Sequence, residues 1–165
     1  MHARVCSLLR VVIFALGAIA VPLAGAGGQD YSPYGNPLAP LTINGVPLKV
    51  ELATTPDKHY LGLSHRPGLP PGQGMLFVFP QAEFQVFCMR DMRFAIDIIW
   101  IEGGKVVGFH ENLSPRDPRN FQSPVPVSLV LEVPAGFARR HGLKPGDPVE
   151  FQLPEARPYS DKHQP

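Results

Sequence analysis

Two apolar runs place the strongest constraint on what this chain can fold into. The run from Met75 to Phe79 is apolar on both faces, and so is the run from Phe94 to Ile101, apart from Asp97. Such runs are typical of strands that are buried on both sides. Few helical patterns are present to supply that cover. We therefore expect each buried strand to lie against another sheet.

Further strands follow from turn signals. Asn44-Gly45 separates Leu41–Ile43 from Val46–Leu52, and this dipeptide between apolar segments is the strongest short signal for a hairpin. In the second segment Lys49 and Glu51 alternate with apolar residues, which predicts one wet face. The remaining predicted strands are Lys105–Phe109 after the Gly103-Gly104 turn, Val125–Val133 and Val149–Leu153.

Two short helices complete the predicted fold. Thr55-Pro56-Asp57 has the capping residue, early proline and early acid of a helix start. A second helix is predicted from Pro134 to His141, where Gly142 supplies the left-handed residue that ends it. The sequence therefore predicts a mainly β, single-domain β-sandwich or barrel of about seven strands with two short helices.

The N-terminus has the layout of a secretory signal peptide. Arg4 and Arg10 precede the uncharged run Val11–Val21, and small residues follow at Ala24-Gly25-Ala26. The run has about 11 residues, whereas a spanning helix needs roughly 20. We expect cleavage near Ala26 and a periplasmic or secreted protein without a membrane span. An uncleaved anchor is the alternative.

The rest of the chain divides by composition. Residues 27–40 predict a flexible linker, 41–153 the β domain and 154–165 a flexible tail. Loss of Arg4 and Arg10 lowers Lys plus Arg from 15 to 13 against 14 Asp plus Glu, so the mature net charge is −1. This charge and the lack of a long basic run disfavour nucleic acid as a partner. Cys88 is the one thiol after residue 26, which excludes an intramolecular disulfide.

Asp97 and His110 are the leading candidates for chemistry. If Gly103-Gly104 forms a two-residue turn, Glu102 pairs with Lys105, and the same register sets Asp97 opposite His110. The carboxylate would then hold the imidazole by a charge-assisted hydrogen bond. The pair predicts either an acid–base or ligand site or a structural contact that satisfies a buried carboxylate.

Other polar residues near this strand are weaker candidates. Arg90 and Asp91 precede it and extend the candidate binding set, which also includes Glu111 beside His110. Cys88 has no local base to activate it and is expected to be a buried strand residue. His59 and His65 have no metal-ligand spacing. No nucleophile elbow, phosphate loop or zinc motif occurs, so we expect neither a metal nor a cofactor.

Several segments in order carry a family resemblance. They are Leu61–Arg66, Leu69-Pro70 with Gly74–Phe79, Met89–Met92, Ile96–Ile99, His110–Leu113, and Leu131–Gly136 through Gly146-Asp147. Together they cover about 51–151 and resemble the family known as domain of unknown function 192. The resemblance implies a small, mostly β protein, often with an export signal. It supplies no catalytic residues, because that family has no established activity.

The chain departs from that family pattern in one region. The pattern has Trp where Cys88 stands, Lys-Asn-Thr where Arg90-Asp91-Met92 stands, and Met-Phe where Ser64-His65 stands. The resemblance implies either a modified site at these positions or a strand edge that is free to vary.

Three hypotheses about function remain. The leading one is a non-catalytic accessory or binding domain of the cell envelope, with a small molecule or an envelope protein as its partner. The second is a hydrolase or transferase of unfamiliar type that uses Asp97 and His110, with Arg90 in support. The third is a structural partner of another envelope protein, which predicts an exposed apolar patch.

Overall fold

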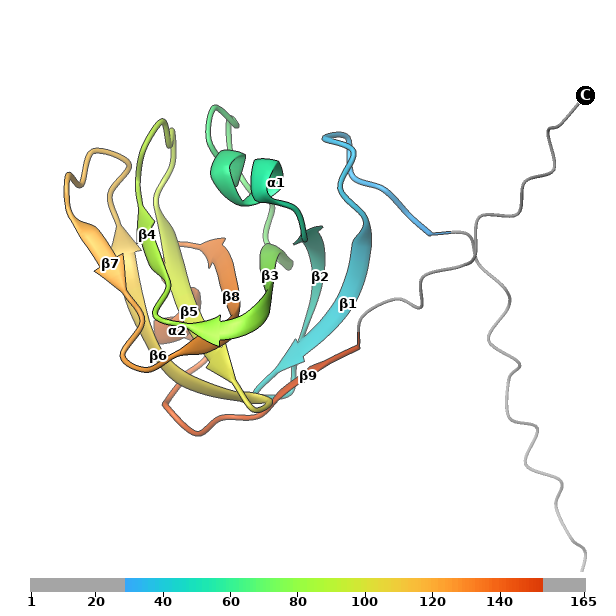
Figure 1. Cartoon of the computed structure of the whole chain (residues 1–165), viewed down its shortest axis with the longest axis vertical. Helices are drawn as coiled ribbons and strands as arrows, with labels where there is room; N and C mark the ends of the chain where they lie inside the picture. The colour runs from blue at the N-terminus through green and yellow to red at the C-terminus, as the bar shows by residue number, and fades with distance from the viewer. Residues whose placement is uncertain (1–28, 153–165) are drawn as a thin grey trace, which may run out of the picture.

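The computed structural model describes residues 29–152, in which one sheet curls into a half-barrel (Figure 1). Seven strands form this sheet in the order β6-β5-β8-β3-β2-β1-β9, and β4 and β7 form a second, two-stranded sheet. The strands are β1 (Leu38–Ile43), β2 (Val46–Ala53), β3 (Gln73–Glu83), β4 (Val86–Cys88), β5 (Ile96–Glu102), β6 (Lys105–Leu113), β7 (Asn120–Gln122), β8 (Val127–Pro134) and β9 (Val149–Phe151). The predicted mainly β fold is confirmed. The predicted signal peptide and C-terminal tail lie outside the described residues.

Both predicted two-residue turns form. Asn44 and Gly45 have φ of 48° and 75°, and β1 pairs with β2 from Ile43 and Val46 outward. Gly103 and Gly104 have φ of 56° and 70° and join Glu102 to Lys105. Positive φ at both central residues matches the twist of the strands that the turn connects.

The curled sheet closes on itself at the end where these turns lie. The Val106 N–H donates to the Asp147 carbonyl oxygen at 2.9 Å, and the Gly146 N–H donates to the Val106 carbonyl oxygen at 2.7 Å. A bridge between Lys105 and Pro148 joins β6 to the segment just before β9. The two edges of the sheet therefore protect each other at this end, as in a barrel.

Each face of the sheet has its own apolar core. One core contains Leu41, Val50, Leu76, Ile99, Ile101 and Leu131 with Phe137 and Ala138 of the short helix α2 (Phe137–Arg140). The other contains Met75, Phe77, Ile98, Trp100 and Val130 with Phe121 of β7 and Met89, and Phe87 of β4 packs against it. The sequence predicted a second sheet as cover, and β4 with β7 supplies part of that cover.

Both predicted helices form, and the second is shorter than predicted. Helix α1 (Pro56–Leu61) begins after Thr55, whose side chain accepts a hydrogen bond from the Lys58 N–H at 3.4 Å. Helix α2 does not begin at Pro134, because β8 continues to that residue and Gly136 then turns the chain with φ of 78°. Gly142 has φ of 59°, as its predicted role requires. Neither helix of residues 29–152 is long and apolar enough to cross a membrane.

The expected linker and the expected wet face both need correction. Part of the predicted linker is folded: β1 begins at Leu38, and Ser32 and Asn36 are buried and hydrogen bonded to Glu51. The alternation of Glu51 with Leu52 predicted an exposed Glu51. Its side chain is instead buried beneath the segment that contains Ser32 and Asn36. A period of two places a side chain on one face of the sheet, but it does not show what covers that face.

Candidate functional site

Asp97 is fully buried and is held by backbone amides. Its Oδ1 accepts hydrogen bonds from the N–H groups of Asn112 at 2.8 Å and Gly136 at 2.9 Å, and its Oδ2 accepts one from the Ala138 N–H at 2.9 Å. Gly136 and Ala138 belong to the start of α2, where backbone N–H groups have no partner within the helix. The carboxylate thus ties β5 to the β6 backbone and to α2, which is a structural role.

His110 does not pair with Asp97, so the predicted register is wrong at this point. A bulge between the turn and Trp100 inserts one extra residue into β6, and His110 stands opposite Ile98. The imidazole lies on the face of Trp100 and Phe121, with ring centroids 5.9 and 5.2 Å apart. Because successive side chains alternate between faces, a shift of one residue places His110 on the opposite face from Asp97.

The other predicted site residues are also not gathered around Asp97. Arg90 donates to the Tyr60 carbonyl oxygen at 3.0 Å, and its Nε lies 3.7 Å from Asp91 Oδ2, so both residues belong to the α1 side of the molecule. Glu111 is exposed on β6. Cys88, which we expected to be buried, is exposed at the end of β4.

The structure instead shows a cavity between α1, β3 and β4. Its volume is about 260 Å³. Its walls come from the α1 turn (His59, Tyr60, Leu61, Gly62, Leu63, Ser64), from β3 (Phe77, Phe79) and from β4 and its flanks (Gln85, Val86, Phe87, Cys88, Arg90, Met92). Glu132 of β8 also lines it. Arg90 is thus the one predicted site residue that lines this cavity, together with Cys88, which was expected to be a buried strand residue.

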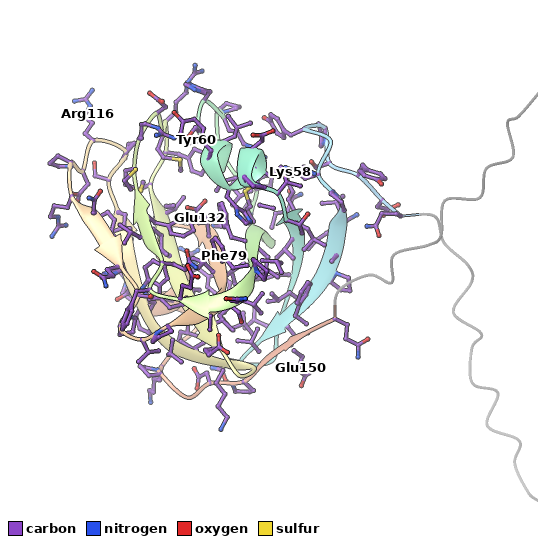
Figure 2. All side chains as sticks on the ribbon, viewed as in Figure 1. Lys58, Tyr60, Phe79, Arg116, Glu132 and Glu150 are labelled. Carbon is purple, nitrogen blue, oxygen red and sulfur yellow. The ribbon has the colours of Figure 1, made fainter. Side chains whose placement is uncertain are left out.

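Glu132 is the most unusual group in the cavity. The residue is 5 % exposed, and its Oε2 has no hydrogen-bond partner among the described residues. Burial raises the pKa of Glu132 to about 8, against a smaller opposing effect from the charge of Arg66. Tyr60 and Phe79, which are labelled together with Glu132 in Figure 2, line the same cavity. A buried carboxyl without a partner is costly for stability and is typical of a functional position.

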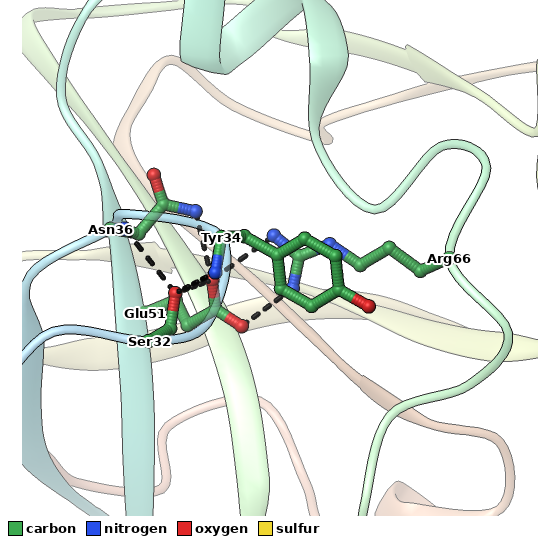
Figure 3. Close-up of polar contacts among 5 residues, drawn as sticks. All are labelled: Ser32, Tyr34, Asn36, Glu51 and Arg66. Carbon is green, nitrogen blue, oxygen red and sulfur yellow. Dashed lines mark hydrogen bonds and ion pairs between the residues drawn. The ribbon is translucent and has the colours of Figure 1, made fainter.

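A second buried glutamate lies nearby and is fully partnered. Glu51 and Glu132 stand on either side of Met75 in neighbouring strands, so the three side chains share one face. The Arg66 guanidinium donates to both Glu51 oxygens, at 2.5 and 3.0 Å, and Ser32 and Asn36 each donate to Oε2 at 2.8 Å (Figure 3).

These contacts decide the charge of Glu51. Burial alone would raise the pKa of its carboxyl, but the hydrogen bonds from Arg66, Asn36 and Ser32 and the Arg66 charge outweigh that effect and lower it. The Tyr34 ring covers the guanidinium, with Arg66 Cζ 3.9 Å from the ring centroid. Glu51 and Arg66, with Ser32 and Asn36, therefore form a closed structural network that leaves no polar group to bind a ligand.

Sequence reasoning missed Glu132, although a signal was present. The carboxylate interrupts the apolar run Val127–Val133 in the same way that Asp97 interrupts its own run. What the pattern does not show is which of the two carboxylates finds partners. Within residues 29–152, no three His, Cys, Asp or Glu side chains lie together in a way that holds a metal ion.

Comparisons with known proteins agree with this fold. The model of the family described as DUF192, uncharacterized ACR, matches residues 39–151. A crystal structure of a protein of unknown function from Novosphingobium aromaticivorans is 31% identical, with a TM-score of 0.71, and the match covers 76% of this chain and 94% of that one.

A second structure comes from Sinorhizobium meliloti, and that protein is described as a proposed transcription regulator. It is 30% identical with a TM-score of 0.67, and the match covers 76% of this chain and 98% of that one. A search among curated proteins found no match.

Proposed function

This chain belongs to the DUF192 family, and we propose that this member is an exported, non-catalytic binding domain of the cell envelope. Its ligand site is the cavity between α1, β3 and β4. The observation that carries the proposal is the carboxyl of Glu132, which is buried at this cavity with an unpartnered oxygen. A binding site of this kind combines apolar walls with a few polar groups that orient the ligand.

The geometry favours binding over catalysis. The acid–base pair suggested by the sequence requires Asp97 and His110 to reach the same substrate, whereas they lie on opposite faces of the sheet. A thiol nucleophile is activated by an adjacent base or by a lowered pKa. Among the described residues Cys88 has no hydrogen bond to His59, whose Nε2 lies 2.9 Å from the Ala53 carbonyl oxygen.

Export is supported by the sequence of residues 1–26. N-terminal sequencing of the protein from fractionated cells tests it. We expect a start near Gly27 in the periplasmic or secreted fraction. A chain that keeps Met1 and sediments with the membrane would contradict export as a cleaved protein.

The binding proposal is tested by native mass spectrometry of the protein purified gently from the export compartment. We expect a reproducible bound mass in the wild type that is lost in Glu132→Gln. The matched control is Glu150→Gln, because Glu150 is an exposed glutamate on β9, away from the cavity residues. A bare protein in all three samples, from cells grown under several conditions, would overturn the proposal.

A second candidate function is docking to an envelope protein, and it rests on the cavity's rim. Tyr60 and Leu61 of α1 are 72% and 54% exposed, and Phe84 and Val86 beside β4 are 56% and 55% exposed. Exposed large apolar side chains that gather around a hollow are typical of interaction sites. This candidate predicts that Phe84→Ser, at an exposed residue outside the cavity lining, weakens a defined cross-link in cells while the bound small mass persists.

A further inference from the structure

We propose that the ligand of this cavity carries a positively charged amine, which lies against the Glu132 carboxylate, and an apolar body, which packs among the rings of Phe77, Phe79 and Phe87. This inference rests on the proposed function and names the chemical class of its ligand. It follows from the polar groups that the cavity leaves unused, from its aromatic wall and from the charges around it.

Among the residues that line the cavity, the one buried side-chain polar atom without a hydrogen-bond partner is a carboxyl oxygen of Glu132. The Ser64 hydroxyl donates to the Arg90 carbonyl oxygen at 3.0 Å, and the Arg90 guanidinium donates to the Tyr60 carbonyl oxygen at 3.0 Å. The Glu132 Oε2 has no such contact among the described residues. A buried carboxylate is stabilised by a charged donor far more than by a neutral one, so its best complement is a cation.

The aromatic wall suits an organic cation. Phe87 packs edge-on against Phe77 with centroids 4.9 Å apart, Phe79 lies 6.5 Å from Phe87, and His59 lies 4.5 Å from Phe79. Ring faces attract a cation within about 6 Å and also bury the carbon atoms attached to it. A bare metal ion would require several oxygen or nitrogen ligands, and the described residues provide no such group.

The charged groups around Glu132 do not neutralise its carboxylate, so one added positive charge would balance the site. The charge of Arg66 acts on Glu132, but Arg66 is already paired with Glu51 in the closed network. Arg90 lies at the cavity's rim, where it stacks over Tyr60 at 4.1 Å and faces Asp91. The remaining titratable groups of the wall are His59 and Cys88. With Glu132 ionised, the buried trio of Glu51, Arg66 and Glu132 has a net charge of −1, which a bound amine neutralises.

Binding then releases a proton. The carboxyl of empty Glu132 is protonated at neutral pH, because burial raises its pKa to about 8. When a protonated amine binds, the carboxyl proton goes to solvent, and a carboxylate–ammonium pair forms. The affinity for an amine should therefore rise about tenfold per pH unit below pH 8 and level off between about pH 8 and the pKa of the amine, about 10.4 for an alkyl amine.

The test compares 2-phenylethylamine with its neutral isostere 2-phenylethanol on the wild-type protein. Titration calorimetry at about pH 6 and about pH 8 should show a roughly fiftyfold gain in amine affinity and no gain for the alcohol, because the ionised fraction of Glu132 rises from about 1% to about half. The rate at which a thiol reagent modifies Cys88, which also lines the cavity, provides a second readout. The amine should slow that reaction more strongly at the higher pH.

Variants separate this inference from the proposed function. Glu132→Gln should lose the pH dependence and at least tenfold of the amine affinity while it keeps its affinity for the alcohol, and Glu150→Gln should behave as the wild type. If the wild type binds the alcohol as tightly as the amine at both pH values, the amine inference fails and the binding cavity stands. If neither compound binds or protects Cys88, the amine inference also fails, and the native mass spectra decide the proposed function independently.

Discussion

Two buried glutamates on one face of the sheet have opposite surroundings. Glu51 and Glu132 flank Met75 and are 4% and 5% exposed, so burial is nearly the same for both. Glu51 is enclosed by Arg66, Ser32 and Asn36, and the pKa of its carboxyl is lowered. Glu132 faces the cavity with an unpartnered oxygen, and burial raises its pKa to about 8.

The difference teaches that burial alone does not decide the role of a carboxyl group. Partners decide it, and those of Glu51 come from segments 15 to 19 residues away in the sequence. Asp97 is a third buried carboxylate, and its partners are backbone amides. Two of the three are therefore structural, and the one left without a complete set of partners lies at the cavity.

The largest expected effect comes from the Glu51 side of the comparison. Arg66→Met leaves a buried carboxylate without its cation, so it should lower the free energy of unfolding by about 3–5 kcal/mol. Urea unfolding at neutral pH measures the loss. Arg119→Met is the control, because its pair with Asp117 is at the surface and the variant should remain close to wild type. A loss in Arg66→Met no larger than in the control would show that the Glu51 network is not structural.

The next effect concerns Glu132 and pH. The folded pKa of about 8 exceeds the ordinary value of 4.5, so between these values the unfolded chain has released a proton that the folded protein retains. Stability is therefore lost as pH rises through this window, by about 1.4 kcal/mol per pH unit. Relative to Glu132→Gln, the wild type should lose about 3 kcal/mol between pH 4.5 and pH 7. Parallel stability curves for the two proteins would contradict the raised pKa.

A smaller loss is expected at Asp97. In Asp97→Asn the amide oxygen still accepts from Asn112 and Gly136, but the amide nitrogen faces the N–H of Ala138. One buried donor is left unsatisfied, which costs about 1–3 kcal/mol. Thermal unfolding measures the loss, and the bound mass in native spectra should persist. If the variant keeps its stability but loses the bound mass, Asp97 belongs to a ligand site after all.

The smallest effect concerns the segment that covers Glu51. Tyr34→Ala removes the ring over Arg66 at a position that is 54% exposed, so it should cost about 0.5–1 kcal/mol. Chemical unfolding compares it with Tyr31→Ala, which is 62% exposed and has no ring contact with Arg66. An equal loss in both variants would mean that the ring does not stabilise the guanidinium.

Local chemistry made much of the fold predictable. Asn44-Gly45 specifies a mirror-image turn, Thr55 caps α1, and Gly142 adopts the left-handed conformation, because each depends on the geometry of a few adjacent residues. The register beyond the Gly103-Gly104 turn was not predictable in this way. A single inserted residue in β6 moved His110 to the other face, and bulges have no reliable signature in one sequence.

The candidate site was predicted only in fragments. Arg90 was a predicted binding residue, and it lines the cavity together with Cys88, which was expected to be buried but is exposed. Strand β7 was not predicted, and β4 was anticipated only through Cys88, because each strand has three residues and gains its stability from the partner strand. Without β4 the cavity lacks one of its walls, so the interruption of an apolar run by Glu132 did not by itself indicate a site.

By itself, the sequence determined the mainly β class, the two tight turns, the start of α1 and the family, because period, turn chemistry and ordered motifs act locally or accumulate along the chain. The tertiary structure alone decided which hydrogen-bond partners, and therefore which charge, each buried carboxyl group has. Glu51, Asp97 and Glu132 all interrupt or join apolar strands, and nothing in their neighbours along the chain distinguishes them. Partners brought from distant segments, or their absence at a cavity, set the charge of each group.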